Sequence, residues 1–214
     1  FVLNNCDTND QMQEIANNIT PKLTELGNDV SLNPELFKRV KAVYDQYERG
    51  ELQLDQEDKM LLEETYKGFV RSGALLEGEA KERLMQINAE LSELSIRFGN
   101  NLLTENGSFQ LVLTDEQVAD LPEGVRNQAK ENAKAAGVEG YVFTLDKPSM
   151  LPFLTYSKNR DLRRELYNGY LMRCNNDNED DNKQLAEDMA RLRVEKAHLL
   201  GFKSYSHYVT DDQM

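Results

Sequence analysis

The longest helical pattern in the chain covers residues 77 to 105 and limits what the chain can fold into. Its apolar residues recur at steps of three and four: Ala80, Leu84, Ile87, Leu91, Leu94, Phe98 and Leu102. This spacing places them on one face of a helix, which at 1.5 Å per residue would be a rod of about 40 Å. A narrow apolar stripe needs a partner helix, and the helix predicted just before it is the nearest candidate. The pattern therefore favours a chain of packed helices.

A first helix is predicted over residues 10 to 26, with Gly27 as its end. Its apolar residues share one face: Met12, Ile15, Ile19, Leu23 and Leu26. Pro21 lacks the N–H that a helical hydrogen bond needs, so we expect a break just before it.

The next two helices have clear boundaries. One runs from an N-cap at Asn33 to the residue before Gly50, and the other from an N-cap at Asp55 to about Ser72. Their predicted buried residues are Leu36, Phe37, Val40, Val43, Tyr44 and Tyr47 in the first, and Leu61, Leu62, Tyr66, Phe69 and Val70 in the second.

After the long helical pattern at 77–105, the spacing of the apolar residues changes from that of a helix to that of a strand. Apolar and polar residues alternate at about 109–113 and again at 141–145, which predicts two short strands. An alanine-rich helix is predicted between them, at about 125–136, with Gly137 as its end. Because two strands alone are barely stable, we expect them to pair with each other and to lie on helices. The predicted fold class is therefore mainly α, with helical hairpins or a bundle and one small two-stranded β element.

Helices are predicted for most of the remaining chain. Ser149 is expected to cap one helix, and the next is expected to begin near residue 159. A last full helix covers about 182–200, and Ser204 is expected to cap one more.

Composition excludes several classes of partner. The 214 residues carry a formal net charge of −13, so an extended phosphate backbone would be repelled and nucleic acid is excluded. No apolar run approaches the roughly 20 residues of a membrane-spanning helix. The chain starts at Phe1 and stops at Met214 with a helix just begun, and we expect it to be a piece of a longer protein.

No catalytic, cofactor-binding or metal-binding residue is predicted in this chain. A zinc peptidase needs two histidines four residues apart with a glutamate between them, whereas His198 and His207 are nine residues apart. His198 is expected to interact with Glu195 or with the helix dipole. Cys6 and Cys174 have no metal-ligand spacing and are expected to be reduced thiols, with a single disulfide as the alternative.

The acidic loop at residues 175–181 has a calcium-binding alternative. Asp177, Glu179 and Asp181 take positions one, three and five of such a loop, and Asp188 takes position twelve. Position six is not the required glycine, and an aspartate at twelve is shorter than the usual glutamate. A solvated loop with helix-capping acids is the favoured interpretation.

Arginines form the other charged cluster. Those within residues 160–164 could meet a peptide carboxylate, but ion pairs with Asp161 and Glu165 are favoured. Arg173 stands beside Cys174 and could lower the pKa of that thiol.

Several segments together resemble a known family. The most specific are Pro148–Ser149, residues 154–157 (LTYS), 159–163 (NRDLR) and 193–202 (RVEKAHLLGF), and residues 84–91 agree as well. The family pattern in the fourth segment reads Arg-x-Glu-x-Ala-x-Leu-Leu-Gly-aromatic. In this order the segments resemble the N-terminal part of the thimet-oligopeptidase-like zinc metallopeptidases, closest to the peptidyl-dipeptidase (Dcp) branch.

The resemblance implies a neurolysin- or Dcp-like N-terminal region. Residues 1–147 would be an N-terminal helical region with the small β element, and residues 148–214 would be the first helices of a catalytic domain. The parent would be a zinc metallopeptidase that releases C-terminal dipeptides from short peptides, and this part would form a wall of its substrate channel. The zinc-binding His-Glu-x-x-His motif is not in this chain, so the chain alone is expected to bind no zinc and to be inactive.

Two alternatives stay open. The parent could be an oligopeptidase A-like endopeptidase, or the chain could be an independent helical binding or scaffold module. The expected partners are short peptides in the parent, with no nucleic acid and no membrane, and the expected state is a monomer. The expected location is cytoplasmic, with the bacterial cell envelope or periplasm as the alternative if an upstream signal exists.

Overall fold

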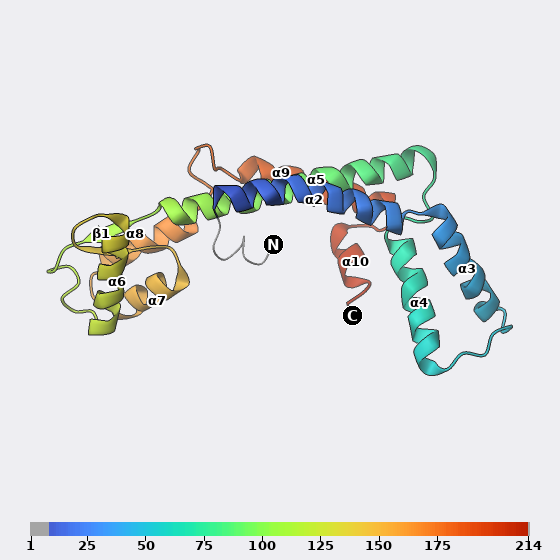
Figure 1. Ribbon diagram of the computed structural model, residues 1–214, viewed down its shortest axis with the longest axis horizontal. Coiled ribbons are helices and arrows are strands. Elements are labelled where there is room, and N and C mark those ends of the chain that lie inside the picture. Colours follow the sequence, from blue (N-terminus) through green and yellow to red (C-terminus); the bar gives the residue numbers. More distant parts are fainter. Residues whose placement is uncertain (1–8, 214) are drawn as a thin grey trace. The chain divides into compact units, whose positions relative to one another are not determined.

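The structure is a computed structural model that describes residues 9–213. It is mainly helical with one small antiparallel sheet (Figure 1), which confirms the predicted fold class. The chain forms two compact units, one made of the residues up to Ile96 and from Leu185 onward, the other of Arg97–Gln184. The predicted boundary between residues 147 and 148 concerns domains of a larger protein, and it stays a prediction.

The predicted rod is a single helix, α5, Gly78–Ser108. In the first unit it lies beside α2, Asp10–Ser31, and α9, Lys183–Leu199 (Figure 1). Leu84 and Ile87 of the stripe are fully buried, and Arg83 forms an ion pair with Glu195 of α9 at 2.6 Å between Nε and Oε1. These contacts differ from the expectation that the stripe packs along the preceding helix, α4, Gln56–Arg71.

Helix α2 is longer than predicted and lacks the predicted break before Pro21. It continues without a break through Pro21 and Gly27. Ala16 is buried before the proline and Thr24 bonds Ser92 of α5 after it, and such tertiary contacts offset the loss of one backbone hydrogen bond. Its buried residues are Ala16 and Asn28. The apolar face identified in the sequence is largely exposed to solvent, at Ile15, Ile19, Leu23 and Leu26.

Helices α3, Pro34–Glu48, and α4 form a hairpin joined by stacked aromatic rings. The rings of Tyr44 and Tyr66 are parallel within 7° at a centroid distance of 3.9 Å. Both predicted N-caps are confirmed, since the side chains of Asn33 and Asp55 accept hydrogen bonds from the first turn of each helix. Leu61 was predicted to be buried but is 67% exposed.

The second unit builds its core around the two predicted strands. They are shorter than predicted, β1 at Leu111–Leu113 and β2 at Tyr141–Phe143, and they pair antiparallel. Three helices accompany them: α6 at Glu123–Ala136, α7 at Lys147–Tyr156 and α8 at Arg160–Leu171. The ring of Phe143 lies 4.5 Å from that of Phe153, centroid to centroid, and Leu166 of α8 is buried in the same cluster.

Turn residues fix how these elements connect. Gly137 ends α6 at φ = 70°, as predicted. Gly140 takes φ = 99° just before β2, and a Cβ there would lie 2.5 Å from the carbonyl oxygen of Leu113. Ser149 does not cap α7, which begins at Lys147; its Oγ accepts a hydrogen bond from the N–H of Thr144 instead.

The last helix is α10, Tyr205–Thr210, and its N-cap is Ser204 as predicted. Arg71 of α4 holds this end of the chain: its Nη1 lies 2.6 Å from Oδ2 of Asp211 and its Nη2 donates to the carbonyl oxygen of Tyr208. Among the residues that the structure describes, no helix has both the length and the apolar composition needed to cross a membrane.

Replacing Phe153 by alanine should destabilise the second unit strongly. The side chain is 0% exposed, and a Phe→Ala change in a core costs about 3–5 kcal/mol of unfolding free energy. Leu151→Ala in the same helix is the control, because Leu151 is exposed and its loss should cost about 0.5 kcal/mol or less. Urea unfolding of both variants measures the difference, and equal midpoints would contradict this core.

Candidate functional site

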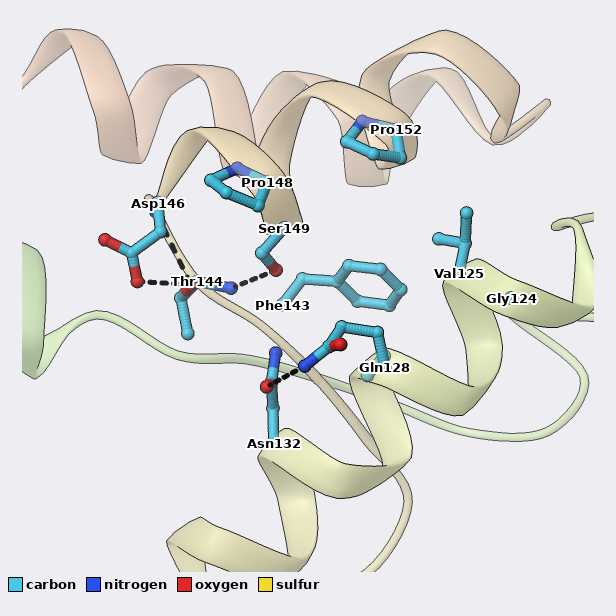
Figure 2. A pocket seen from close by; sticks show the side chains of 11 residues that line it. Gly124, Val125, Gln128, Asn132, Phe143, Thr144, Asp146, Pro148, Ser149 and Pro152 are labelled. Carbon is cyan, nitrogen blue, oxygen red and sulfur yellow. Dashed lines mark hydrogen bonds between the residues drawn. The ribbon is translucent and has the colours of Figure 1, made fainter.

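A cavity of about 660 Å³ opens between α6, the end of β2 and the start of α7 (Figure 2). Val125 and Pro152 contribute a partly exposed apolar surface, while Gln128 and Asn132 come from successive turns of α6. Thr144 and Ser149 add hydroxyl groups from β2's end and from α7. The cavity thus combines an apolar surface with amide and hydroxyl groups, the composition of many small-ligand and peptide sites.

Hydrogen bonds hold the walls of this cavity together. The side-chain amide of Asn132 donates to the carbonyl oxygen of Val142 at 3.3 Å, which ties α6 to β2. The N–H of Thr144 donates to Ser149 Oγ at 3.0 Å, which ties β2 to α7. Thr144 Oγ1 in turn donates to Asp146 Oδ2 at 3.0 Å (Figure 2). These hydrogen bonds link α6, β2 and α7 around the cavity.

The chemistry of the lining is that of a binding site. Asp146 is the one ionisable side chain among the lining residues. Nucleophilic catalysis needs a nucleophile within hydrogen-bond reach of a base, and Ser149 Oγ is already engaged by a backbone N–H. Among the lining residues, the hydroxyl within hydrogen-bond reach of a carboxylate is Thr144 Oγ1, which donates to Asp146 Oδ2 at 3.0 Å. The cavity can therefore hold and orient a ligand through amide, hydroxyl and carboxylate groups.

A second polar centre surrounds Glu105 in the last turns of α5. Its carboxylate is 7% exposed and accepts hydrogen bonds from the N–H of Cys174 and from the amides of Asn176 and Asn178. Burial alone would raise the pKa of Glu105, but these donors outweigh it and lower the pKa below its ordinary value. A buried anion satisfied in this way anchors the loop that follows α8.

Asn182 anchors the other end of the same loop. Its Oδ1 accepts from the side-chain amide of Asn101 at 2.9 Å, and its Nδ2 donates to the carbonyl oxygen of Phe98 at 3.0 Å. The loop from Cys174 to Asn182 is therefore attached to α5 at both ends by buried polar groups.

The acidic loop holds a lysine in the place considered for calcium. Lys183 Nζ lies 2.5 Å from Asp177 Oδ1 and 3.0 Å from Asp181 Oδ2. Asp181 also accepts from the N–H of Asp177. Among the described residues, no three His, Cys, Asp or Glu side chains gather in a group that could bind a metal ion. Lys183 thus pairs with two of the four acids of the loop, and Asp181 also accepts a hydrogen bond from the backbone N–H of Lys183 at the start of α9.

The two histidines are engaged separately. His198 Nε2 lies 3.3 Å from the carbonyl oxygen of Lys203, and His207 Nδ1 lies 2.7 Å from Ser204 Oγ. Glu195, a predicted partner of His198, instead receives both Nε and Nη2 of Arg83. The structure does not bring the histidines together as a pair of ligands.

Cys174 is buried and forms no disulfide bond with another described residue. Burial raises its pKa, and the nearby Glu105 carboxylate raises it further. The predicted lowering by Arg173 is thus outweighed; that guanidinium donates to Asn106 and to the carbonyl of Tyr170. Cys6 lies outside the described residues, so the state of a Cys6–Cys174 pair stays a prediction.

Two of the arginines at 160–164 bond groups close to them in sequence. Arg164 Nη1 lies 3.1 Å from Asp161 Oδ1, as the favoured interpretation predicts. Arg163 Nη1 donates to the carbonyl oxygen of Ser157. These two guanidinium groups stabilise the start of α8.

Three features were missed in the sequence, and two of them left a signal there. Glu105 follows Phe98 and Leu102 on the apolar stripe, and a charge in such a position indicates a paired, buried group. Lys196 stands next to buried Ala197 on α9; its Nζ donates to Asn88 Oδ1 at 2.7 Å, and burial lowers its pKa. The α6–α7 cavity left none, because its residues come from three separate elements.

Comparisons with known proteins all point to one family of peptidases. Residues 153–214 match the model described as peptidase family M3. Oligopeptidase A of Haemophilus influenzae is 34% identical over 209 residues, which cover 95% of this chain and 30% of that protein. Dipeptidyl carboxypeptidase of Escherichia coli is 32% identical over 216 residues, which cover 100% of this chain and 31% of that protein.

More distant relatives agree. Thimet-like oligopeptidase of Dictyostelium discoideum is 26% identical over 96% of this chain and 30% of that protein. The predicted family resemblance is confirmed, and both oligopeptidase A and dipeptidyl carboxypeptidase are among the relatives. The chain spans about 30% of the length of the curated relatives it matches.

Replacing Glu105 by glutamine should destabilise the protein in a pH-dependent way. A folded-state pKa below the ordinary value means that the carboxylate stabilises the fold above its unfolded pKa, roughly 4.3, and loses this effect as pH falls through the folded pKa. At neutral pH the variant should lose about 1–3 kcal/mol of unfolding free energy. One of the groups that donate to the carboxylate would then face the NH2 group of glutamine, which cannot accept a hydrogen bond. The gap should shrink steadily in acid.

Urea unfolding from neutral pH down to pH 3 measures this gap. Glu116→Gln is the control, since Glu116 is exposed, and its effect should stay small throughout. A Glu105→Gln effect that does not change with pH would contradict the role given to the charge.

Proposed function

We propose that this chain, which belongs to peptidase family M3, is the N-terminal, non-catalytic part of a zinc metallopeptidase that cleaves short peptides. The observation that carries the proposal is the 34% identity to oligopeptidase A across 95% of the chain. The chain spans about 30% of that relative's length, so the catalytic residues are assigned to the rest of the parent protein.

The zinc is likewise assigned to the rest of the parent. The described residues of this chain do not fit it: they contain no cluster of metal ligands, and His198 and His207 are bonded to separate partners. No catalytic step is therefore assigned to any residue here. Residues 148–214 would be the first helices of the catalytic domain, as the family match at 153–214 supports.

The role proposed for this part is to form a wall of the substrate channel. Such a wall needs a fixed surface that excludes folded proteins and contacts a peptide. The cavity in Figure 2 is the described feature best suited to that contact. Gln128 can exchange hydrogen bonds with peptide amides, and the partly exposed side chains of Val125 and Pro152 can contact an apolar side chain.

Two forms of the reaction are supported by the relatives. Release of C-terminal dipeptides is our first proposal, and dipeptidyl carboxypeptidases are among the similar proteins. Internal cleavage is the second candidate, because oligopeptidase A proteins match equally well. An independent scaffold module is less well supported, since similarity to the peptidases runs through the whole chain.

The other properties of the parent are proposals as well. We expect a cytoplasmic monomer that acts on peptides and binds neither nucleic acid nor membranes. The net charge of −13 supports the exclusion of nucleic acid. A location in the cell envelope is the alternative, for a parent with an export signal.

The full-length parent tests the proposal directly. It should contain about one zinc ion per chain, expected for a His-Glu-x-x-His site, and should cleave short peptides until a chelator removes the metal. Mass spectrometry of the products separates dipeptide release from internal cleavage. A parent that lacks the motif, or that binds zinc but cleaves no peptide, would contradict the proposal.

Gln128→Ala in the parent tests the peptide contact. Loss of one neutral hydrogen bond should raise KM about 2- to 10-fold with little change in kcat, provided that peptide binding equilibrates before chemistry. Alanine favours the helix, so α6 should stay folded. Asn127→Ala is the matched control, an exposed amide on the same helix outside the cavity lining. Equal KM values for both variants would show that the cavity does not contact the peptide.

A further inference from the structure

A row of large apolar side chains runs along the solvent side of α2. We call it the α2 seam, and its residues are Ile15, Ile19, Leu23, Leu26 and Val30. Each is between 40% and 58% exposed. The steps of four and three residues place them on one face, over about 22 Å of helix. Single exposed apolar residues are ordinary, but a continuous row of five marks a surface that meets a partner.

The seam is not the side that attaches α2 to its own unit. That side carries small and polar residues: Ala16 is buried, and Thr24 Oγ1 lies 2.8 Å from Ser92 Oγ of α5. Asn28 is also buried there, and its Oδ1 accepts from the side-chain amide of Asn88. The helix therefore buries small residues on one side and exposes large aliphatic residues on the adjacent side. That adjacent side can pack against a second helix.

We infer that one helix from the part of the parent outside this chain packs along the α2 seam. This inference rests on the proposed function in one respect, namely that the parent is longer than this chain. The relatives that match it are about three times its length, because the matches cover 30–31% of them. A covering segment in the same polypeptide has a high effective concentration, which favours it over a separate molecule.

Charge argues against a second copy of this chain as the occupant. The polar flank of the seam carries Glu14, Glu25 and Asp29, with Lys22 as the basic residue among them. Two copies placed seam to seam would bring these acidic flanks near each other, and each chain has a net charge of −13. The helix that fits has apolar residues at steps of three and four, with lysine or arginine beside them.

Cysteine labelling in the full-length parent tests this inference. Leu23→Cys places a thiol on the seam, and Glu25→Cys places one on the polar flank of the same turn, where Glu25 is exposed. Both are made in a background in which Cys6 and other accessible cysteines are serine, whereas Cys174 is buried and stays. The rate of reaction with a maleimide is measured in native buffer and divided by the rate in 6 M guanidinium chloride, which removes differences in intrinsic reactivity.

A covered seam should make Leu23→Cys react roughly tenfold or more slowly than Glu25→Cys, at every protein concentration. Equal normalised rates would overturn the inference, because both positions are exposed in this chain taken alone. Protection that grows with protein concentration, together with a doubled mass in light scattering, would mean that a second copy covers the seam, and this would overturn it too. Leu26→Cys is the second seam position if Leu23→Cys does not fold.

The parent's peptidase activity separates this inference from the proposed function. A parent that cleaves peptides but shows equal labelling rates keeps the function and loses the covering helix. A parent with a protected seam and no peptidase activity supports the covering helix and loses the proposed function.

Discussion

The buried face of α5 is the constraint on which the first unit depends. Leu84 and Ile87 are fully excluded from solvent, and exclusion requires neighbours along the rod. The neighbours are attached by polar bonds at its edges: Arg83 to Glu195 of α9, and Ser92 to Thr24 of α2. Non-directional burial supplies the attraction, while these bonds fix which helix lies where. The hydrogen bond from Arg83 to Glu195 also raises the pKa of Arg83 and lowers that of Glu195.

Helix and strand positions could be predicted because their signals are local. Each signal depends only on a few neighbouring residues. Examples are the helix caps Asn33 and Asp55, the helix end at Gly137, and the change from helical to strand spacing of apolar residues at residue 109. Partner choice could not be predicted, because it depends on residues far apart in sequence. The α2 seam shows the difference: its periodicity correctly predicted a helix, but the periodicity cannot say whether the partner lies within this chain.

The candidate cavity was beyond sequence reasoning for a related reason. Gln128 and Asn132 look like ordinary surface residues of an alanine-rich helix, and Ser149 looked like a helix cap. They become walls of one cavity only when β2 brings α6 and α7 together. Family resemblance was readable from short motifs such as residues 193–202, but those motifs identify ancestry and leave the shape of a binding surface undetermined.

The described residues with strongly altered environments serve the fold itself. Glu105 is buried beneath the loop that it anchors, Cys174 is buried beside it, and Lys196 donates to Asn88 between helices. Perturbed pKa values often mark active sites, but here each altered group is turned toward a structural partner, and the α6–α7 cavity is lined by neutral amides and hydroxyls apart from Asp146. A surface that guides a peptide without reacting with it needs its ionisable groups with altered pKa values to be buried away from the peptide. A reactive group that faced the peptide would compete with the catalytic centre. The altered groups among the described residues therefore stabilise the fold, which is what the proposed channel wall requires of them.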